Sequence, residues 1–435
     1  MSINRKILDL ALPNIVSNIT VPLVGLVDIW LMGHLDNAVY IGAILLGSMI
    51  FLFLYAGFMF LRMGTTGFTA QARGARNLQE TINILGRALL IVLLASVLLI
   101  AFQSIIGWIS FKLISGSSEV ESLALEYFRI RIWAAPATLG IFVLSGWFIG
   151  MQNAKTPMII ALLVNIANII FSAFFIMYLG MKSDGVALGT VIAQYSGLIL
   201  GLVLLFRYYG KLFKYWRLKS ILYWEAIKQF MKVNNNILIR SILLTGTFFY
   251  FTAESASYGD DILSINSLLL QFLWILSYFI DGFAFAAEAL VGKAVGAKNR
   301  SQLSSTIKSI FRWGFYISIP VTLIYVLFNQ WMLTVLTDNH ELILLSKDYE
   351  FWIWLMPLIT FSAYIWDGIY VGATAGAAMR NTMILSSLLI FLPAYYLLKA
   401  DFGNQALWFA IMLFMAARGI TMTVISKKVV YRTFL

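Results

Sequence analysis

Long apolar segments recur along the whole chain and are separated by short polar stretches. A helix needs about 20 apolar residues to cross the hydrocarbon core of a bilayer. Twelve segments of that length are found, with approximate centres at Thr20, Leu52, Leu98, Gly140, Asn168, Leu198, Ser241, Leu276, Thr322, Thr360, Leu389 and Leu413. The pattern predicts an all-α polytopic membrane protein with twelve transmembrane helices.

Composition agrees with this fold class and excludes others. Hydrophobic residues make up 61% of the 435 residues and charged residues 12%, which excludes a water-soluble globule. The absence of cysteine excludes disulfide and thiolate chemistry. The two histidines, His34 and His340, fall in loops, and the sequence has no nucleophile-base or metal-ligand spacing and no P-loop. We therefore expect neither an enzyme nor a protein with a cofactor.

Basic residues concentrate in alternate loops. One set of loops carries most of the lysine and arginine, and the other set carries most of the acids, with Lys112, Lys182, Lys347 and Lys399 as exceptions. This placement accounts for the net charge of +11 without a nucleic-acid partner. Positively charged loops stay in the cytoplasm, so both termini are predicted there, which requires an even number of spans.

Two halves of the chain resemble each other at a constant offset of about 222 residues. Three separated sites carry the match, namely Gly74-Ala75-Arg76-Asn77 with Gly296-Ala297-Lys298-Asn299, Ser145-Gly146 and Gly150 with Asp367-Gly368 and Gly372, and Tyr127 with Tyr349. The sequence thus predicts two parallel six-helix repeats, an N-terminal lobe (1–210) and a C-terminal lobe (223–435) joined by a cytoplasmic linker (211–222). Paired repeats of this kind enclose a central cleft and transport by alternating access.

The first apolar segment, Leu12–Leu35, contains a carboxylate and two prolines. Asp28 lies roughly 8–10 Å along the helix from the polar end at Gly33, too far for its short side chain to reach water there. An acid at such depth costs about 2.5–3.5 kcal/mol and usually marks an ion or substrate path. The alternative is an interfacial Asp on a short or tilted helix. Pro13 and Pro22 each remove a helical hydrogen bond, which favours either a bending point or a static kink.

The sequence resembles the multidrug and toxic compound extrusion (MATE) family, and within it the DNA-damage-inducible F branch. The similarity covers essentially the whole chain and is carried by Pro13-Asn14-Ile15, Pro22-Leu23, Val27-Asp28, Met32–Leu35, Phe60–Gly67, Ala70–Ala75, Asp281–Ala284 and Ala287–Gly292. The resemblance implies a V-shaped pair of six-helix lobes around a cleft. It also implies export of organic cations in exchange for protons or sodium ions, across the inner membrane of a prokaryote.

The same resemblance implies a polar pocket in the N-terminal lobe. Its members would be Asp28, Tyr127, Ser145, Asn165, Asn168, Ser172 and Thr190. Ser172 stands where an Asp often follows the fifth-helix Asn, and Ser145 replaces a pocket amide. For Asn165 and Asn168, hydrogen bonding between helices is the alternative role.

The missing Asp bears on the coupling ion. Sodium requires several oxygen ligands with fixed negative charge, whereas a proton requires one carboxylate with a raised pKa. We therefore favour H⁺ as coupling ion, with Na⁺ as the alternative. A lone buried carboxylate holds either a proton or a cationic substrate, so competition at Asp28 would be the exchange itself.

Acids in the second lobe have open roles. Asp367 lies inside the tenth span and is either a second proton or cation site or the partner of a buried arginine such as Arg240. Asp281 and Glu288, seven residues apart on one helix face, favour gating or structural ion pairs near the cytoplasmic end.

The sequence excludes one other transporter class and leaves a second one open. A major-facilitator protein is excluded because its Gly-x-x-x-Asp-Arg-x-Gly-Arg-Arg loop is missing. A flippase for a lipid-linked or amphipathic substrate remains the alternative. The expected partners are organic-cation or amphipathic small molecules and the lipid bilayer, with the protein a monomer.

Overall fold

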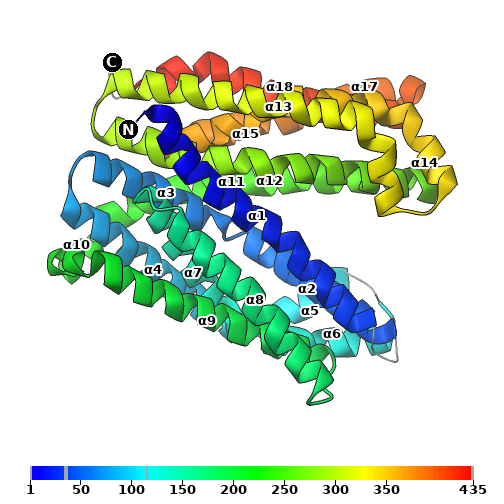
Figure 1. The fold of residues 1–435 in the computed structure, drawn as a ribbon, viewed down its shortest axis with the longest axis horizontal. Coiled ribbons are helices and arrows are strands. Elements are labelled where there is room, and N and C mark those ends of the chain that lie inside the picture. Colours follow the sequence, from blue (N-terminus) through cyan, green and yellow to red (C-terminus); the bar gives the residue numbers. More distant parts are fainter. Residues whose placement is uncertain (1, 34–37, 114–115, 433–435) are drawn as a thin grey trace. The chain divides into compact units, whose positions relative to one another are not determined.

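The computed structural model describes residues 2–33, 38–113 and 116–432, without the side chains of residues 21, 23, 24, 28–32, 38 and 113. All regular secondary structure in these ranges is helical (Figure 1). The helices of the first half are α1 (Ile3–Gly33), α2 (Ala38–Ala56), α3 (Met59–Gly74), α4 (Leu78–Ala101), α5 (Gln103–Leu113), α6 (Ser118–Arg131), α7 (Ala135–Gly150), α8 (Lys155–Met177), α9 (Ser183–Tyr209) and α10 (Leu218–Ile221).

The second half of the described chain is also built from helices. They are α11 (Trp224–Ser257), α12 (Asp260–Gly296), α13 (Arg300–Leu336), α14 (His340–Ser346), α15 (Glu350–Gly372), α16 (Gly376–Ile384), α17 (Leu392–Phe402) and α18 (Asn404–Val429). A π-helical segment, Leu385–Phe391, joins α16 to α17 without a break.

Among the described residues, eleven continuous helical stretches are long and apolar enough to cross a membrane, and each matches one of the predicted spans. The remaining predicted span, centred near Thr360, lies on α15. That helix has 23 residues, but Trp, Tyr and Asp367 lower its mean hydropathy. The all-helical, multi-pass fold is confirmed.

The chain forms two compact units, and α1 belongs to both. One unit is Met1–Ile15 with Met231–Leu435, and the other is Val16–Phe230. In the first unit, α1 contacts α12 so closely that a Cβ on Gly282 would lie 2.8 Å from the Ala11 carbonyl oxygen. In the second unit, Asn165 of α8 donates a hydrogen bond of 2.8 Å to the Thr20 hydroxyl. The predicted lobe boundaries at residues 210 and 223 stay a prediction.

The predicted repeat is confirmed by backbone contacts at the predicted offset. Gly146 of α7 packs against the Arg62 carbonyl of α3, and Gly368 of α15 packs against the Ala284 carbonyl of α12. In both places any Cβ would collide with the facing carbonyl oxygen. The second pair of residues is the first pair shifted by 222, so each half is built on the same close crossing of two helices.

Helix ends repeat in the same way. Arg76 (φ 57°) and Lys298 (φ 51°) both take the left-handed conformation that ends a helix. The following residues, Asn77 and Asn299, then cap α4 and α13, because each side-chain oxygen accepts a backbone N–H three residues later at 2.9 Å. The Gly-Ala-basic-Asn motif found in the sequence is therefore a turn that closes one helix and starts the next.

Candidate functional site

In the second unit, Asn168 of α8 and Thr190 of α9 form one hydrogen-bonded pair. The Asn168 amide donates to the Thr190 hydroxyl at 2.9 Å, and that hydroxyl donates to the Val186 carbonyl at 2.9 Å. The helices approach closely because Gly189 has no side chain, and a Cβ there would lie 2.8 Å from the Ser172 backbone nitrogen. The structure thus brings together three of the predicted pocket residues, Asn168, Ser172 and Thr190.

Two polar atoms of this group remain available. The Asn168 Oδ1 and Ser172 Oγ atoms are buried and have no hydrogen-bond partner within the described ranges. Buried polar groups are almost always paired, so orphaned ones need a reason, such as a bound ligand or ion. The amide oxygen is an acceptor and the hydroxyl is both donor and acceptor. These two oxygen atoms are the candidate ligand contacts of this part of the unit.

Tyr127 of α6 belongs to a different cluster. Its hydroxyl lies 3.1 Å from the Ser48 hydroxyl and accepts a hydrogen bond of 2.5 Å from Arg131. Arg131 also donates to Ser48 at 3.1 Å and lies 4.8 Å from the ring centre of Phe51. The spacing of four between Tyr127 and Arg131 places both on one helix face, but nothing in the sequence indicates their contact with Ser48.

Other predicted residues of the first half are placed more simply. Asn165 bonds to Thr20, as the interhelical alternative expects. Ser145 is half-buried on α7. The backbone of Asp28 is helical, but its side chain lies outside the described residues. Helix α1 continues through Pro13, which is buried, and Pro22, which is half-buried.

In the first unit, Asp367 of α15 is held by two arginines. Its Oδ2 atom accepts hydrogen bonds from Arg240 of α11 and, at 2.7 Å, from Arg418 of α18. The three residues are nearly inaccessible, with exposed fractions of 6% for Asp367, 7% for Arg240 and 1% for Arg418. The Arg240 partner proposed from the sequence is thus present. The second partner, Arg418, was not predicted from the sequence. A charged residue inside the last apolar span is nevertheless a signal of a buried pairing or a functional site.

This arginine-aspartate-arginine cluster carries a net charge of +1. The Asp367 Oδ1, Arg240 Nε and Arg418 Nε atoms are buried without a hydrogen-bond partner among the described residues. A third cation at Asp367 would meet two guanidinium groups in a medium of low dielectric constant. The pairing with Arg240 matches the structural alternative for Asp367, and its role as a second proton or cation site stays a prediction.

Asp281 and Glu288 both lie on α12. Asp281 is half-buried, whereas Glu288 is 1% exposed, and its backbone carbonyl lies next to Gly372 of α15. Their role in gating or ion pairing stays a prediction.

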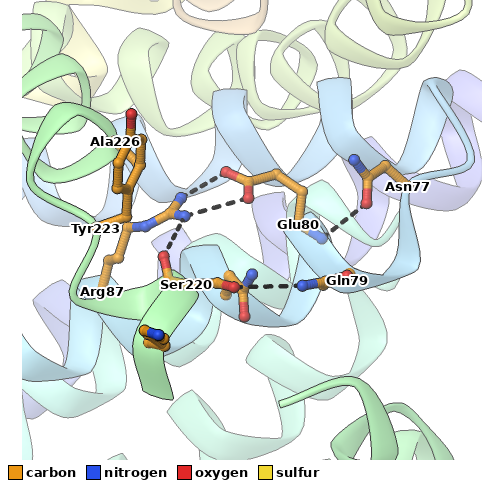
Figure 2. A pocket seen from close by; sticks show the side chains of 9 residues that line it. Asn77, Gln79, Glu80, Arg87, Ser220, Tyr223 and Ala226 are labelled. Atoms are coloured by element: carbon orange, nitrogen blue, oxygen red, sulfur yellow. Dashed lines mark hydrogen bonds and ion pairs between the residues drawn. The ribbon is translucent and has the colours of Figure 1, made fainter. Parts of the chain in front are cut away.

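A cavity of about 430 Å³ lies in the second unit where the segment after α9 returns over α4. Arg87 of α4 makes two hydrogen bonds with the Glu80 carboxylate, at 2.5 and 3.2 Å, and a third with the Ser220 carbonyl of α10 at 3.0 Å. Figure 2 shows Arg87 between the two partners. The Gln79 amide donates to the Ser220 hydroxyl at 3.4 Å. These contacts attach the linker to α4.

Comparison with known proteins gives the family. The model of the MatE family matches residues 13–174 and 237–397, one copy in each half of the chain. This chain belongs to the MATE family. It is 35% identical to DNA damage-inducible protein F of Escherichia coli (strain K12), over 98% of this chain and 93% of that protein. MATE proteins are transporters of the multidrug and toxin extrusion class, and this chain is one of their multi-pass membrane members.

Solved MATE structures share its fold. An outward-facing multidrug resistance MATE family transporter of the MOP superfamily has a TM-score of 0.87 at 18% identity, covering 100% of this chain and 97% of that chain. A MOP superfamily transporter from Pyrococcus furiosus, described as having a binding pocket of reverse polarity, has a TM-score of 0.86 at 18% identity with the same coverage.

Proposed function

We propose that this MATE protein is a secondary active efflux antiporter of the prokaryotic inner membrane that exports organic cations in exchange for protons by alternating access. The observation that carries the proposal is the state of Asp367. Because Asp367 is already paired with two buried arginines, it is poorly placed to bind an organic cation. Asp28 is then the acid best suited to coupling, and it lies on the helix shared by both units.

The surroundings expected for Asp28 favour a proton over sodium. The family's additional carboxylate is replaced by Ser172, whose buried hydroxyl supplies one neutral oxygen. Sodium binds best with several oxygens and one or two fixed negative charges. A proton needs only one carboxylate in a site of low dielectric constant. Proton and organic cation would compete for that carboxylate, so binding of one releases the other.

The identity of the coupling ion is tested in inverted membrane vesicles whose membrane contains the protein. A proton gradient alone is expected to drive accumulation of ethidium, and a sodium gradient at fixed pH is expected to drive none. The reverse result would replace protons by sodium ions as the coupling species.

The role of Asp28 is tested with Asp28→Asn, which keeps the size of the side chain and removes its charge. We expect ethidium-induced proton release to be lost while the amount of folded protein in the membrane is unchanged. Unchanged proton release from the variant would remove Asp28 from the mechanism. Asp9→Asn is a matched control, because it removes a carboxylate from an exposed position on the same helix and should leave proton release unchanged.

A flippase for a lipid-linked or amphipathic substrate is the second candidate. The excess positive charge of Arg240 and Arg418 favours it, because that buried charge would stabilise an anionic head group at a distance, through a medium of low dielectric constant. Reconstituted protein that translocates a fluorescent lipid phosphate, but no ethidium, would establish this function instead.

A further inference from the structure

The first four turns of α13 present an open basic face. Arg300, Ser304, Lys308 and Arg312 recur at every fourth position and so share one side of the helix, together with Ser301, Ser305 and Ser309. These seven residues line a hollow of about 760 Å³, which we call the α13 groove. Arg300, Lys308 and Arg312 are exposed and form no ion pair within the part of the chain that the structure describes.

The repeat shows what normally lies against this face. Helix α4 is the counterpart of α13 in the first half, and there Gln79 and Arg87 bond to Ser220 in the linker. Their counterparts at the offset of 222 are Ser301 and Ser309, which have no such bond to another element among the described residues. The face that the linker fills on α4 is therefore not filled on α13 by any of the described residues.

Directly beyond the basic residues, the same helix turns apolar. Phe315, Tyr316, Ile319 and Leu323 are exposed by 46%, 56%, 39% and 54%. They continue the spacing of three or four residues from Arg312, so they extend the groove along the membrane-spanning part of α13. An occupant of the whole groove must have an anionic head and a long apolar tail.

We infer that the α13 groove binds an anionic glycerophospholipid. Lys308 and Arg312, one helical turn apart, hold the phosphate, the serine hydroxyls donate to its oxygens, and an acyl chain lies along the apolar residues beyond. The charge asymmetry of the loops predicts that this end of α13 faces the cytoplasm, where the leaflet is anionic. The lipid thereby occupies the face of α13 that corresponds to the face of α4 occupied by the linker.

The inference is tested by native mass spectrometry on the full-length protein, delipidated in detergent and titrated with phosphatidylglycerol. Each basic residue near an anionic head group contributes about fivefold to affinity, so Lys308→Gln with Arg312→Gln should weaken binding by about 30-fold. Lys228→Gln with Lys232→Gln is the matched control, because these exposed lysines of α11 have the same spacing and lie outside the groove. The control should bind as the unsubstituted protein does.

Two further probes separate lipid from free anion. Phosphatidylcholine and short-chain phosphatidylglycerol should each bind at least tenfold more weakly than the long-chain anionic lipid. Ser305→Glu keeps every basic residue and adds a carboxylate at an exposed position, so it should weaken binding even if the double variant fails to fold. Equal losses in the lysine control, or displacement of the lipid by millimolar inorganic phosphate, would overturn the inference.

Discussion

Replacing Asp367 by asparagine is the most informative single change in the second half of the chain. The substitution keeps the shape of the side chain and removes the one negative charge between Arg240 and Arg418. If the role of Asp367 is structural, the free energy of unfolding should fall. If Asp367 is a transport site, only the rate of efflux should fall.

The size of the effect follows from burial. Arg418 is 1% exposed and Arg240 is 7% exposed, so neither guanidinium can turn to water when its partner is lost. Removing one partner of a buried ion pair costs about 3–5 kcal/mol of folding free energy. Arg240→Gln should cost much less, roughly 1 kcal/mol, because it leaves Arg418 and Asp367 as a matched pair.

The assay is reversible unfolding of purified protein in mixed micelles of increasing sodium dodecyl sulfate content, followed by tryptophan fluorescence. We expect Asp367→Asn to lower the unfolding free energy by about 3–5 kcal/mol. The double variant with Arg240→Gln should recover part of that loss, since it removes one of the two stranded cations. A variant Asp367→Asn that is as stable as the parent but inactive in efflux would refute the structural role.

Two further predictions concern the glycine-to-carbonyl crossings and the contact between Arg87 and the linker. In the same unfolding assay, Gly146→Ala and Gly368→Ala should each destabilise the protein by about 1–3 kcal/mol, because the added Cβ meets a backbone carbonyl. Gly246→Ala is the control: a Cβ there has no neighbouring atom within 4 Å, so this variant should be as stable as the parent or more stable. Arg87→Met removes the hydrogen bond to Ser220 and should therefore speed trypsin cleavage of the linker at residues 211–219. An unchanged cleavage rate would show that Arg87 does not hold the linker against α4.

Much of the fold could be predicted from the sequence because bilayer physics imposes a strong pattern. Long apolar helices and the Gly-Ala-basic-Asn turns are local signals, and the offset of 222 residues is found by comparing the two halves directly; the structure contains each of them. The span on α15 was found from its length even though its aromatic residues and Asp367 lower its hydropathy.

The candidate sites were less predictable because their partners are distant in sequence. Asp367 lies 127 residues from Arg240 and 51 from Arg418, and nothing in the order of residues indicates which helix faces meet. Likewise, Arg87 meets Ser220 across 133 residues, through a linker with no regular hydrophobic period. Pairings of this kind depend on helix rotation, which hydropathy does not determine.

The glycine-to-carbonyl crossings also bear on how the two halves could diverge. Gly150 faces the carbonyl of Thr66, and Gly372 faces that of Glu288 in the same position of the other half. Because the contact with the carbonyl is a main-chain contact, it places no demand on the side chain of the residue that supplies that carbonyl. After duplication, a neutral residue in one copy could become an acid in the other without disturbing the scaffold, leaving a single architecture with two unlike interiors.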